Sequence, residues 1–131
     1  MRYILMIFLI LTGCALNRIL KPRLKPPHKV NGGYIFQFYA PYARMVNLAG
    51  DFNGWCGTVS GPFNPEIGKM YDDGTHGDKK AGDGIWTIIV NLKPGVYKYK
   101  FVVDGMYWYT DPSNPETITE GGYTNSVVRV K

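Results

Sequence analysis

The amino-acid sequence predicts an all-β fold of about seven short strands, and three observations support it. Apolar and polar residues alternate in several stretches, among them Tyr34–Ala40 and Gly95–Val103, with the period of a strand that buries one face. The 16 glycines and 9 prolines of the 131 residues favour tight turns between such stretches. No stretch of the folded part has the apolar spacing of a helix of useful length. Short strands with frequent turns over about a hundred residues indicate an Ig-like β-sandwich.

The first strands are predicted at the start of the folded part. Tyr34–Ala40 alternates, and Arg44–Ala49 follows it after a proline turn. The next segment, Gly50–Trp55, contains too many turn-forming residues to continue as a strand. We expect Phe52 to fill the core. Trp55 is expected at a loop tip, where a large exposed ring is typical of a binding surface.

The middle of the chain has the weakest pattern. A short strand is predicted at Ile67–Tyr71, before an Asp- and Gly-rich loop at Asp72–Gly84. Carboxylates at this density suit Ca²⁺, which takes six to eight oxygen ligands. The spacing is not that of an EF-hand, however, and Lys79 and Lys80 interrupt it. We therefore favour successive Asx and Gly turns over a calcium site and assign no metal and no cofactor.

Four strands, two of them in one hairpin, are predicted from Ile85 onward. Ile85–Leu92 is a strand with both faces largely covered, so Trp86 is assigned to the core. Gly95–Pro112 is a hairpin around an Asp104-Gly105 turn, in which the short Asp side chain would bond its own backbone. Ser126–Lys131 is the closing strand.

The return strand of this hairpin carries three consecutive aromatic residues, Tyr107, Trp108 and Tyr109. Such a density beside the strand residue Lys100 fits either a corner of the core or a platform for a flat ligand. The residues of the hairpin alone leave both interpretations open.

Residues 1–13 are interpreted as a bacterial lipoprotein signal peptide. Arg2 precedes an apolar run of about nine residues, well short of the roughly 20 that span a membrane. Leu11-Thr12-Gly13-Cys14 resembles a lipobox, after which Cys14 would be acylated and would anchor the protein. The alternative is an ordinary secretory peptide with an incidental cysteine. The prediction is a protein of the bacterial cell envelope, in the outer rather than the inner membrane because Ala15 is not the aspartate of many inner-membrane lipoproteins.

Residues 14–32 are interpreted as a basic, Pro-rich tether, and residues 33–131 as the folded domain. The tether has no acidic residue, and its prolines favour extended geometry. From Val30 to Lys131 the chain has nine Lys and Arg against all ten Asp and Glu, so the folded part is close to neutral. This distribution argues against nucleic-acid binding by the domain. The tether cations suit anionic lipid headgroups, or serve as a solvated linker.

The residues do not favour an enzyme. Catalysis by Cys56 would need a neighbouring base, and the two histidines, His28 and His76, lie in the tether and in the acidic loop. Glycosidases need a pair of facing carboxylates, whereas most acids here occupy turns. We predict no catalytic residue. With Cys14 acylated, Cys56 has no partner for an intramolecular disulfide and is expected to fill space.

Three motifs in order carry a family resemblance: Leu48–Trp55, Gly95–Pro112 and Asn125–Val128. They resemble the glycogen-binding domain of the AMP-activated protein kinase β subunit, the related family 48 carbohydrate-binding modules and the isoamylase-type early-set domains. The resemblance covers nearly all of residues 33–131 and implies an Ig-like early-set sandwich. In that family two tryptophans, a lysine and an asparagine hold α-1,4-linked glucose. The matching positions are Trp55, Lys100, Trp108 and Asn125.

The resemblance therefore implies a non-catalytic domain that binds glycogen-like or starch-like glucan. One extra residue before Trp108, compared with the kinase hairpin, leaves open whether Tyr107 replaces or assists it. Gly121 and Tyr123 occupy a loop in which the kinase domain uses other residues. Some early-set domains bind no sugar and pack against a neighbouring enzyme, so an envelope protein partner is the alternative function.

Overall fold

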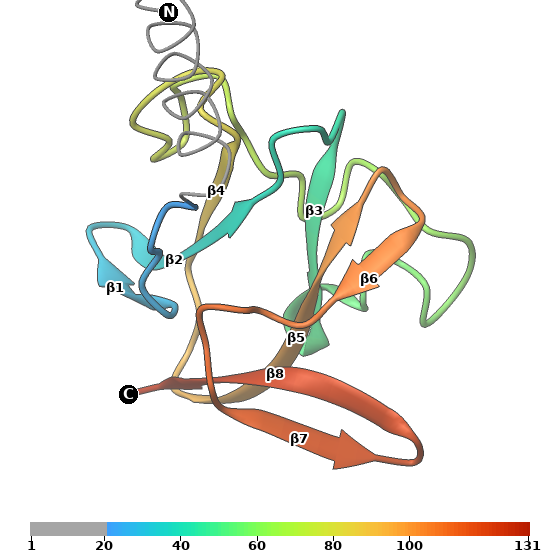
Figure 1. The fold of residues 1–131 in the computed structure, drawn as a ribbon. Coiled ribbons are helices and arrows are strands. Elements are labelled where there is room, and N and C mark those ends of the chain that lie inside the picture. Colours follow the sequence, from blue (N-terminus) through green and yellow to red (C-terminus); the bar gives the residue numbers. More distant parts are fainter. Residues whose placement is uncertain (1–20) are drawn as a thin grey trace, which may run out of the picture.

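The computed structural model describes residues 21–131, which form two antiparallel sheets packed as a sandwich (Figure 1). The fold prediction is confirmed: the described residues contain eight strands, and their one helical element is a short 3-10 turn, η1 (Asp51–Asn53). The predicted signal peptide, Cys14 and Ala15 lie outside the described residues. Residues 21–131 contain no helix with the length and hydropathy to cross a membrane.

The smaller sheet has the order β1-β2-β4. Strand β2 (Gly33–Tyr39) pairs with β4 (Ile85–Val90), and Phe36 lies opposite Ile88. The third strand, β1 (His28–Val30), pairs with β2 in the register His28 to Ile35. This differs from the sequence interpretation, which placed residues 28–32 in the tether. Three residues of alternating environment are too few to distinguish a strand from a linker without knowledge of the partner.

The larger sheet has the order β3-β5-β8-β7, and β6 also pairs with β5. Its central strand is the predicted first arm of the hairpin, β5 (Gly95–Val103). Along one edge of β5, the first half pairs with β8 (Tyr123–Val130) and the second half with β6 (Tyr107–Tyr109). Strands β3 (Val46–Gly50) and β7 (Thr117–Glu120) complete the sheet. Nine residues make β5 long enough to serve both partners.

Aromatic rings fill the space between the sheets. Phe38 stacks on Phe101 with ring centroids 4.6 Å apart, and Phe36 meets Tyr99 edge-on at 5.1 Å. Phe52 and Trp86 pack against this core as half-buried residues, in agreement with their assignment. Such pairs contribute beyond the burial of apolar surface.

A hydrogen-bonded cluster of three polar side chains, Tyr99, Asp111 and Ser126, is built into the core. The Tyr99 hydroxyl donates to Asp111 at 2.7 Å, and the Ser126 hydroxyl accepts the Asp111 amide. Burial, and next the Asp111 carboxylate, raise the pKa of Tyr99 above its ordinary value. Asp111, which lies at the end of the predicted hairpin, thus connects the hairpin to β8.

The segment predicted as a strand at Ile67–Tyr71 is not one. It makes two isolated bridges, one from Lys69 to β3 and one from Tyr71 to β4, and so crosses from one sheet to the other. Gly68 lies so close to β3 that an added Cβ would be 2.1 Å from the Leu48 carbonyl oxygen. An apolar segment with this composition cannot be told from a strand by its pattern alone.

The Asp104-Gly105 turn forms as predicted, with both residues at positive φ. The Asp104 side chain, however, does not bond its own turn. Its carboxylate accepts the amides of Arg44 and Met45 at 2.8 and 3.0 Å. These residues precede β3, which begins at Val46 and not at Arg44 as expected. The turn residue therefore ties the β5–β6 hairpin to the loop between β2 and β3.

Candidate functional site

The outer face of β5 forms the floor of the candidate site. Tyr97, Tyr99 and Phe101 contact the core, so strand alternation turns Lys98, Lys100 and Val102 to the opposite face. Lys100 pairs with Ala49 of β3. Tyr99 pairs with Ser126 of β8, which places the neighbouring Asn125 on the same outer face as Lys100. Two residues distant in sequence are thereby brought together.

Trp108 stands on the same face, on β6. It pairs with Val102, whose side chain is directed outward. Its ring meets Phe63 edge-on with centroids 6.3 Å apart and remains 38% exposed. Phe63, which lies in the loop after β3, thus holds the Trp108 indole in place while part of the ring stays exposed to solvent.

A small buried cluster outside the main core supports this region. Ala49, Cys56 and Val102 are fully buried, and Trp55, Phe63 and Ile67 pack against them. Burial raises the pKa of Cys56 to about 11, and its thiol lies within hydrogen-bond distance of the Ile67 carbonyl at 3.2 Å. Such a thiol is unreactive at neutral pH. Cys56 fills space, as expected.

Trp55 is held in place by a network of loop contacts. The Asn53 side chain donates to the Leu48 carbonyl at 2.8 Å and accepts the Gly50 amide at 3.0 Å. The Trp55 ring nitrogen donates to Asp51 at 3.2 Å. Trp55 is half-buried, and the cluster behind it makes it less free than a residue at a loop tip.

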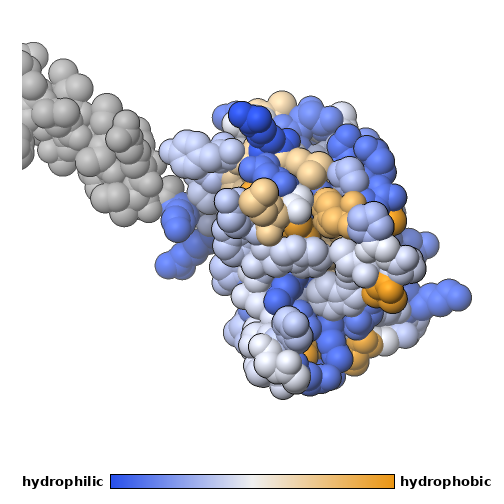
Figure 2. Space-filling view, turned by 90° about the vertical axis from the view of Figure 1, so that its right-hand side faces the viewer, coloured by the Kyte–Doolittle hydropathy of each residue, from blue (hydrophilic) through white to orange (hydrophobic). Residues whose placement is uncertain are grey.

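A cavity of about 510 Å³ opens on this face, and its volume is within the usual range of ligand sites. Four of the five residues predicted to bind carbohydrate, Trp55, Lys100, Trp108 and Asn125, line it. Figure 2 views the molecule from the side on which β6 and the loop after β3 lie in Figure 1. Its hydrophobic residues form small groups among hydrophilic and intermediate ones.

Two further residues, Glu120 and Tyr123, form a wall that the sequence analysis did not assign. They face each other across the β7–β8 hairpin, whose turn is Gly121-Gly122 with both residues at positive φ. Glu120 also pairs with Lys98 at 3.2 Å. A Gly-Gly pair flanked by alternating residues is a hairpin signal and marks this wall in the sequence.

Tyr107, the fifth predicted residue, lies elsewhere. It pairs with Val103, so its side chain leaves β6 on the opposite side from Trp108. There it lines a separate cavity of about 290 Å³ with Tyr39, Tyr42 and Tyr109. The structure therefore does not bring Tyr107 to the cavity of Trp55 and Trp108.

The acidic loop contains two Asx turns, in which the Asp73 and Asp83 carboxylates accept the amides of Thr75 and Ile85. Asp72, Asp78 and Asp83 each accept a backbone amide, from Gly84, Gly74 and Ile85 respectively. Their oxygens also lie within 4.8 Å of one another. Burial, and next the contact with Asp83, raise the pKa of Asp72 above its ordinary range. This loop is not part of the cavity.

Comparison with known proteins gives the same family as the sequence motifs. A family model described as the glycogen recognition site of AMP-activated protein kinase matches residues 35–131. PTST homolog 2, a chloroplastic protein of Arabidopsis thaliana, is 36% identical over 86 residues, 66% of this chain and 13% of that protein.

Two further relatives are an enzyme and a kinase subunit. The 1,4-alpha-glucan branching enzyme GlgB of Desulfitobacterium hafniense is 36% identical over 77 residues, 57% of this chain and 10% of the enzyme. The AMP-activated protein kinase subunit beta-1 of Sus scrofa is 31% identical over 88 residues, 67% of this chain and 56% of the subunit. This chain spans only a part of each relative. Because the family model matches most of its length, the chain belongs to the family of the glycogen recognition site of AMP-activated protein kinase.

Proposed function

We propose that the chain binds α-1,4-linked glucan, such as glycogen, starch or maltooligosaccharides, without catalysis. The observation that carries the proposal is the convergence of Trp55, Trp108, Lys100 and Asn125 on one open cavity. Glucose units present apolar C–H faces, which lie favourably against indole rings. Their hydroxyl rims need donors and acceptors, which an ammonium and an amide provide.

The polar groups of the cavity are suited to a neutral ligand. Glu120 is paired with Lys98, whereas no ion pair joins the Lys100 ammonium to any group of residues 21–131. Lys100 is thus available to donate to sugar hydroxyls. By analogy with base stacking, each ring contributes roughly 1–3 kcal/mol. After ordering costs we expect modest affinity, about millimolar to micromolar.

The absence of catalysis is part of the proposal. Glycoside hydrolysis uses two carboxylates about 5–9.5 Å apart on either side of the bond. Among the six residues that line the cavity, Glu120 is the one carboxylate, and it is held in an ion pair. The match covers only 10% of the branching enzyme, so the activity of that enzyme is not carried over to this chain.

The decisive test is affinity electrophoresis in gels with and without glycogen. The fragment Lys21–Lys131 is suitable because it contains both sheets and both buried clusters. We expect glycogen to retard it, and Trp55→Ala or Trp108→Ala to abolish the retardation. Migration unaffected by glycogen, or retardation that both variants retain, refutes the proposal.

We further propose that the protein is held at the bacterial cell envelope, in the outer membrane, by acyl chains on Cys14. The support is the lipobox-like Leu11–Cys14 behind a short apolar run. Labelling of cells with a palmitate analogue tests this. The wild-type protein is expected to carry the label and to fractionate with the outer membrane, and Cys14→Ser to lose the label. Unlabelled wild-type protein would contradict the proposal.

A further inference from the structure

A second group of exposed aromatic and apolar side chains lies at one end of the sandwich. We name it the tyrosine patch: the exposed Tyr42, Met106, Tyr107 and Tyr109, with the half-buried Tyr39 beside them. Tyr42 is 95% exposed, Met106 68% and Tyr107 55%. Tyr39, Tyr42, Tyr107 and Tyr109 line the cavity of about 290 Å³ described above. Exposed groups of this kind mark interaction surfaces.

The patch is one surface and not two independent loop tips. Tyr42 lies in the loop between β2 and β3, whereas Met106 and Tyr107 belong to the β5–β6 hairpin. The Asp104 carboxylate binds the amides of Arg44 and Met45, and the Asp104 amide donates to the Met45 carbonyl at 2.8 Å. Three hydrogen bonds thus hold the two tips side by side.

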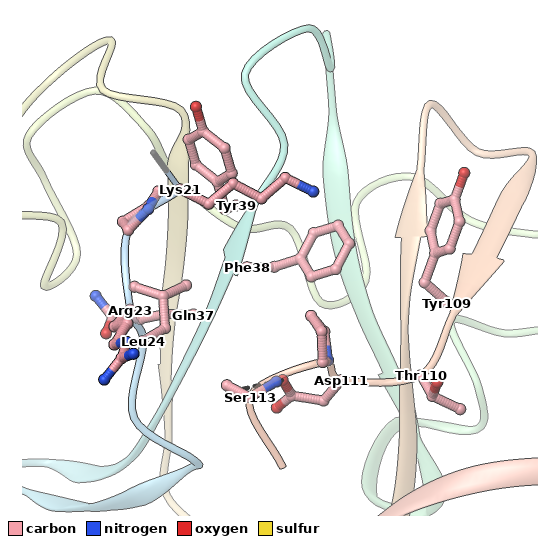
Figure 3. Close-up of a pocket in the computed structure, with 12 residues that line it drawn as sticks. Lys21, Arg23, Leu24, Gln37, Phe38, Tyr39, Tyr109, Thr110, Asp111 and Ser113 are labelled. Atoms are coloured by element: carbon pink, nitrogen blue, oxygen red, sulfur yellow. Dashed lines mark hydrogen bonds between the residues drawn. The ribbon is translucent and has the colours of Figure 1, made fainter. Parts of the chain in front are cut away.

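A basic segment, residues 21–25, runs beside the patch. The segment and the patch together line a cavity of about 540 Å³, to which Lys21, Arg23, Leu24, Tyr39 and Tyr109 contribute. Figure 3 shows Lys21 next to Tyr39, with Phe38 and Tyr109 across the opening. The segment is tied to the sandwich by the Ser113 hydroxyl, which donates to the Lys25 carbonyl at 3.3 Å.

The charge of this surface is positive. Lys21, Arg23 and Lys25 alternate along the basic segment, and Arg44 lies two residues after Tyr42. These four cations outnumber the two carboxylates that line the cavities, Asp104 and Asp111. Asp104 accepts backbone amides, and Asp111 is 3% exposed and accepts the hydroxyls of Tyr99 and Ser113. Tyrosines beside exposed Lys and Arg suit the interface of an anionic bilayer.

Chain length places the same surface near the proposed anchor. The seven residue steps from Cys14 to Lys21 span at most about 25 Å. Acyl chains on Cys14 would therefore keep Lys21, which shares a cavity with Tyr39 and Tyr109 of the tyrosine patch, within that distance of the bilayer. This step rests on the proposed anchor.

We propose that the tyrosine patch and the basic segment dock the domain on an anionic membrane surface. Trp108 leaves β6 on the opposite side from Tyr107, so the glucan cavity stays open to solvent in this orientation. The domain then binds lipid and glucan at the same time.

Vesicle sedimentation of Lys21–Lys131 tests the patch without the acyl chains. We expect binding to phosphatidylcholine vesicles that contain phosphatidylglycerol, weaker binding without it, and a loss at high salt. The double variant Tyr42→Ser/Tyr107→Ser should bind several-fold more weakly, and Trp108→Ala should bind as the wild type. No binding to anionic vesicles, or full binding by the double variant, overturns the proposal.

Glycogen gels with the same proteins separate this proposal from the glucan proposal. The double variant is expected to be retarded as the wild type is. If it loses retardation and keeps vesicle binding, the patch is a second glucan surface and membrane docking by it is wrong. If no protein is retarded but the vesicle results hold, the glucan proposal alone fails.

Tyrosine nitration of the full chain in anionic vesicles tests the orientation. Tetranitromethane should modify Tyr42 and Tyr107 more slowly in vesicles than in detergent. Tyr123, 72% exposed at the glucan cavity, is the internal control and should be protected by maltoheptaose only. Equal rates at Tyr42 and Tyr107 in vesicles and in detergent, with Cys14 acylation verified by mass, contradict docking by this surface.

Discussion

Two aromatic surfaces of this molecule share one three-residue strand and differ in what surrounds the rings. Trp108 lines a cavity with Lys100 and Asn125, whereas Tyr107 and Tyr109 line the separate cavity of about 290 Å³ with Tyr39 and Tyr42. The Trp surface is backed by the buried cluster around Cys56, and Tyr42 of the other surface projects into solvent. Aromatic density in a sequence thus marks a surface, but strand alternation decides which neighbours each ring receives.

The largest expected effect sets the two sides of β6 against each other. Trp108→Ala should weaken glucan binding about tenfold or more, because one ring contributes roughly 1–3 kcal/mol. Tyr107→Ala should leave it unchanged. Isothermal titration calorimetry with maltoheptaose measures both. A comparable loss in both variants would mean that the two rings act on one ligand.

The polar floor of the cavity should have the next largest effect. Lys100→Met and Asn125→Ala each remove hydrogen bonds to the sugar, which contribute about 1 kcal/mol each, so binding should weaken about fivefold. Lys98→Met is the matched control, since Lys98 lies on the same strand face but pairs with Glu120. Glucan binding that is as weak in Lys98→Met as in Lys100→Met would show a general effect of charge and not contacts of Lys100 with hydroxyls.

The β7–β8 wall should contribute less. Tyr123 is more exposed than Trp108, so Tyr123→Ala should weaken binding only about two- to threefold, at the low end of ring stacking. Tyr123→Phe keeps the ring and should bind as the wild type. Weak binding by Tyr123→Phe would assign the effect to the hydroxyl.

The acidic loop lies outside both surfaces and should affect stability alone. The folded-state pKa of Asp72 is raised by burial and by Asp83, so its ionisation costs stability as the pH rises through that pKa. Asp72→Asn should therefore raise the Tm at pH 7, and the gain should vanish below the ordinary carboxyl range. Glucan binding should not change.

Asp73→Asn is the control with the opposite sign. The Thr75 hydroxyl bonds the Asp73 carboxylate and lowers its pKa, so the ionised form is favoured in the folded state and no gain at pH 7 is expected. Thermal unfolding followed by circular dichroism across the pH range distinguishes the two. A gain in both variants would indicate a general effect of the loop's net charge.

Residues in local patterns were predictable from the sequence. Alternation located β2, β4 and β5, Asp104-Gly105 located the turn between β5 and β6, and three motifs identified the family. The motifs also named four residues that the fold gathers in one cavity. These features depend on neighbours within a few positions, which the sequence displays directly.

Only the tertiary structure decided the rest. His28–Val30 is a strand because β2 offers it an edge, and the Ile67–Tyr71 segment bridges two sheets because Gly68 approaches Leu48. Glu120 and Tyr123 reach the cavity through the pairing of β7 with β8. Tyr107 and Trp108, adjacent in sequence, separate because their strand pairs with β5 in one register and a strand turns successive side chains to opposite faces.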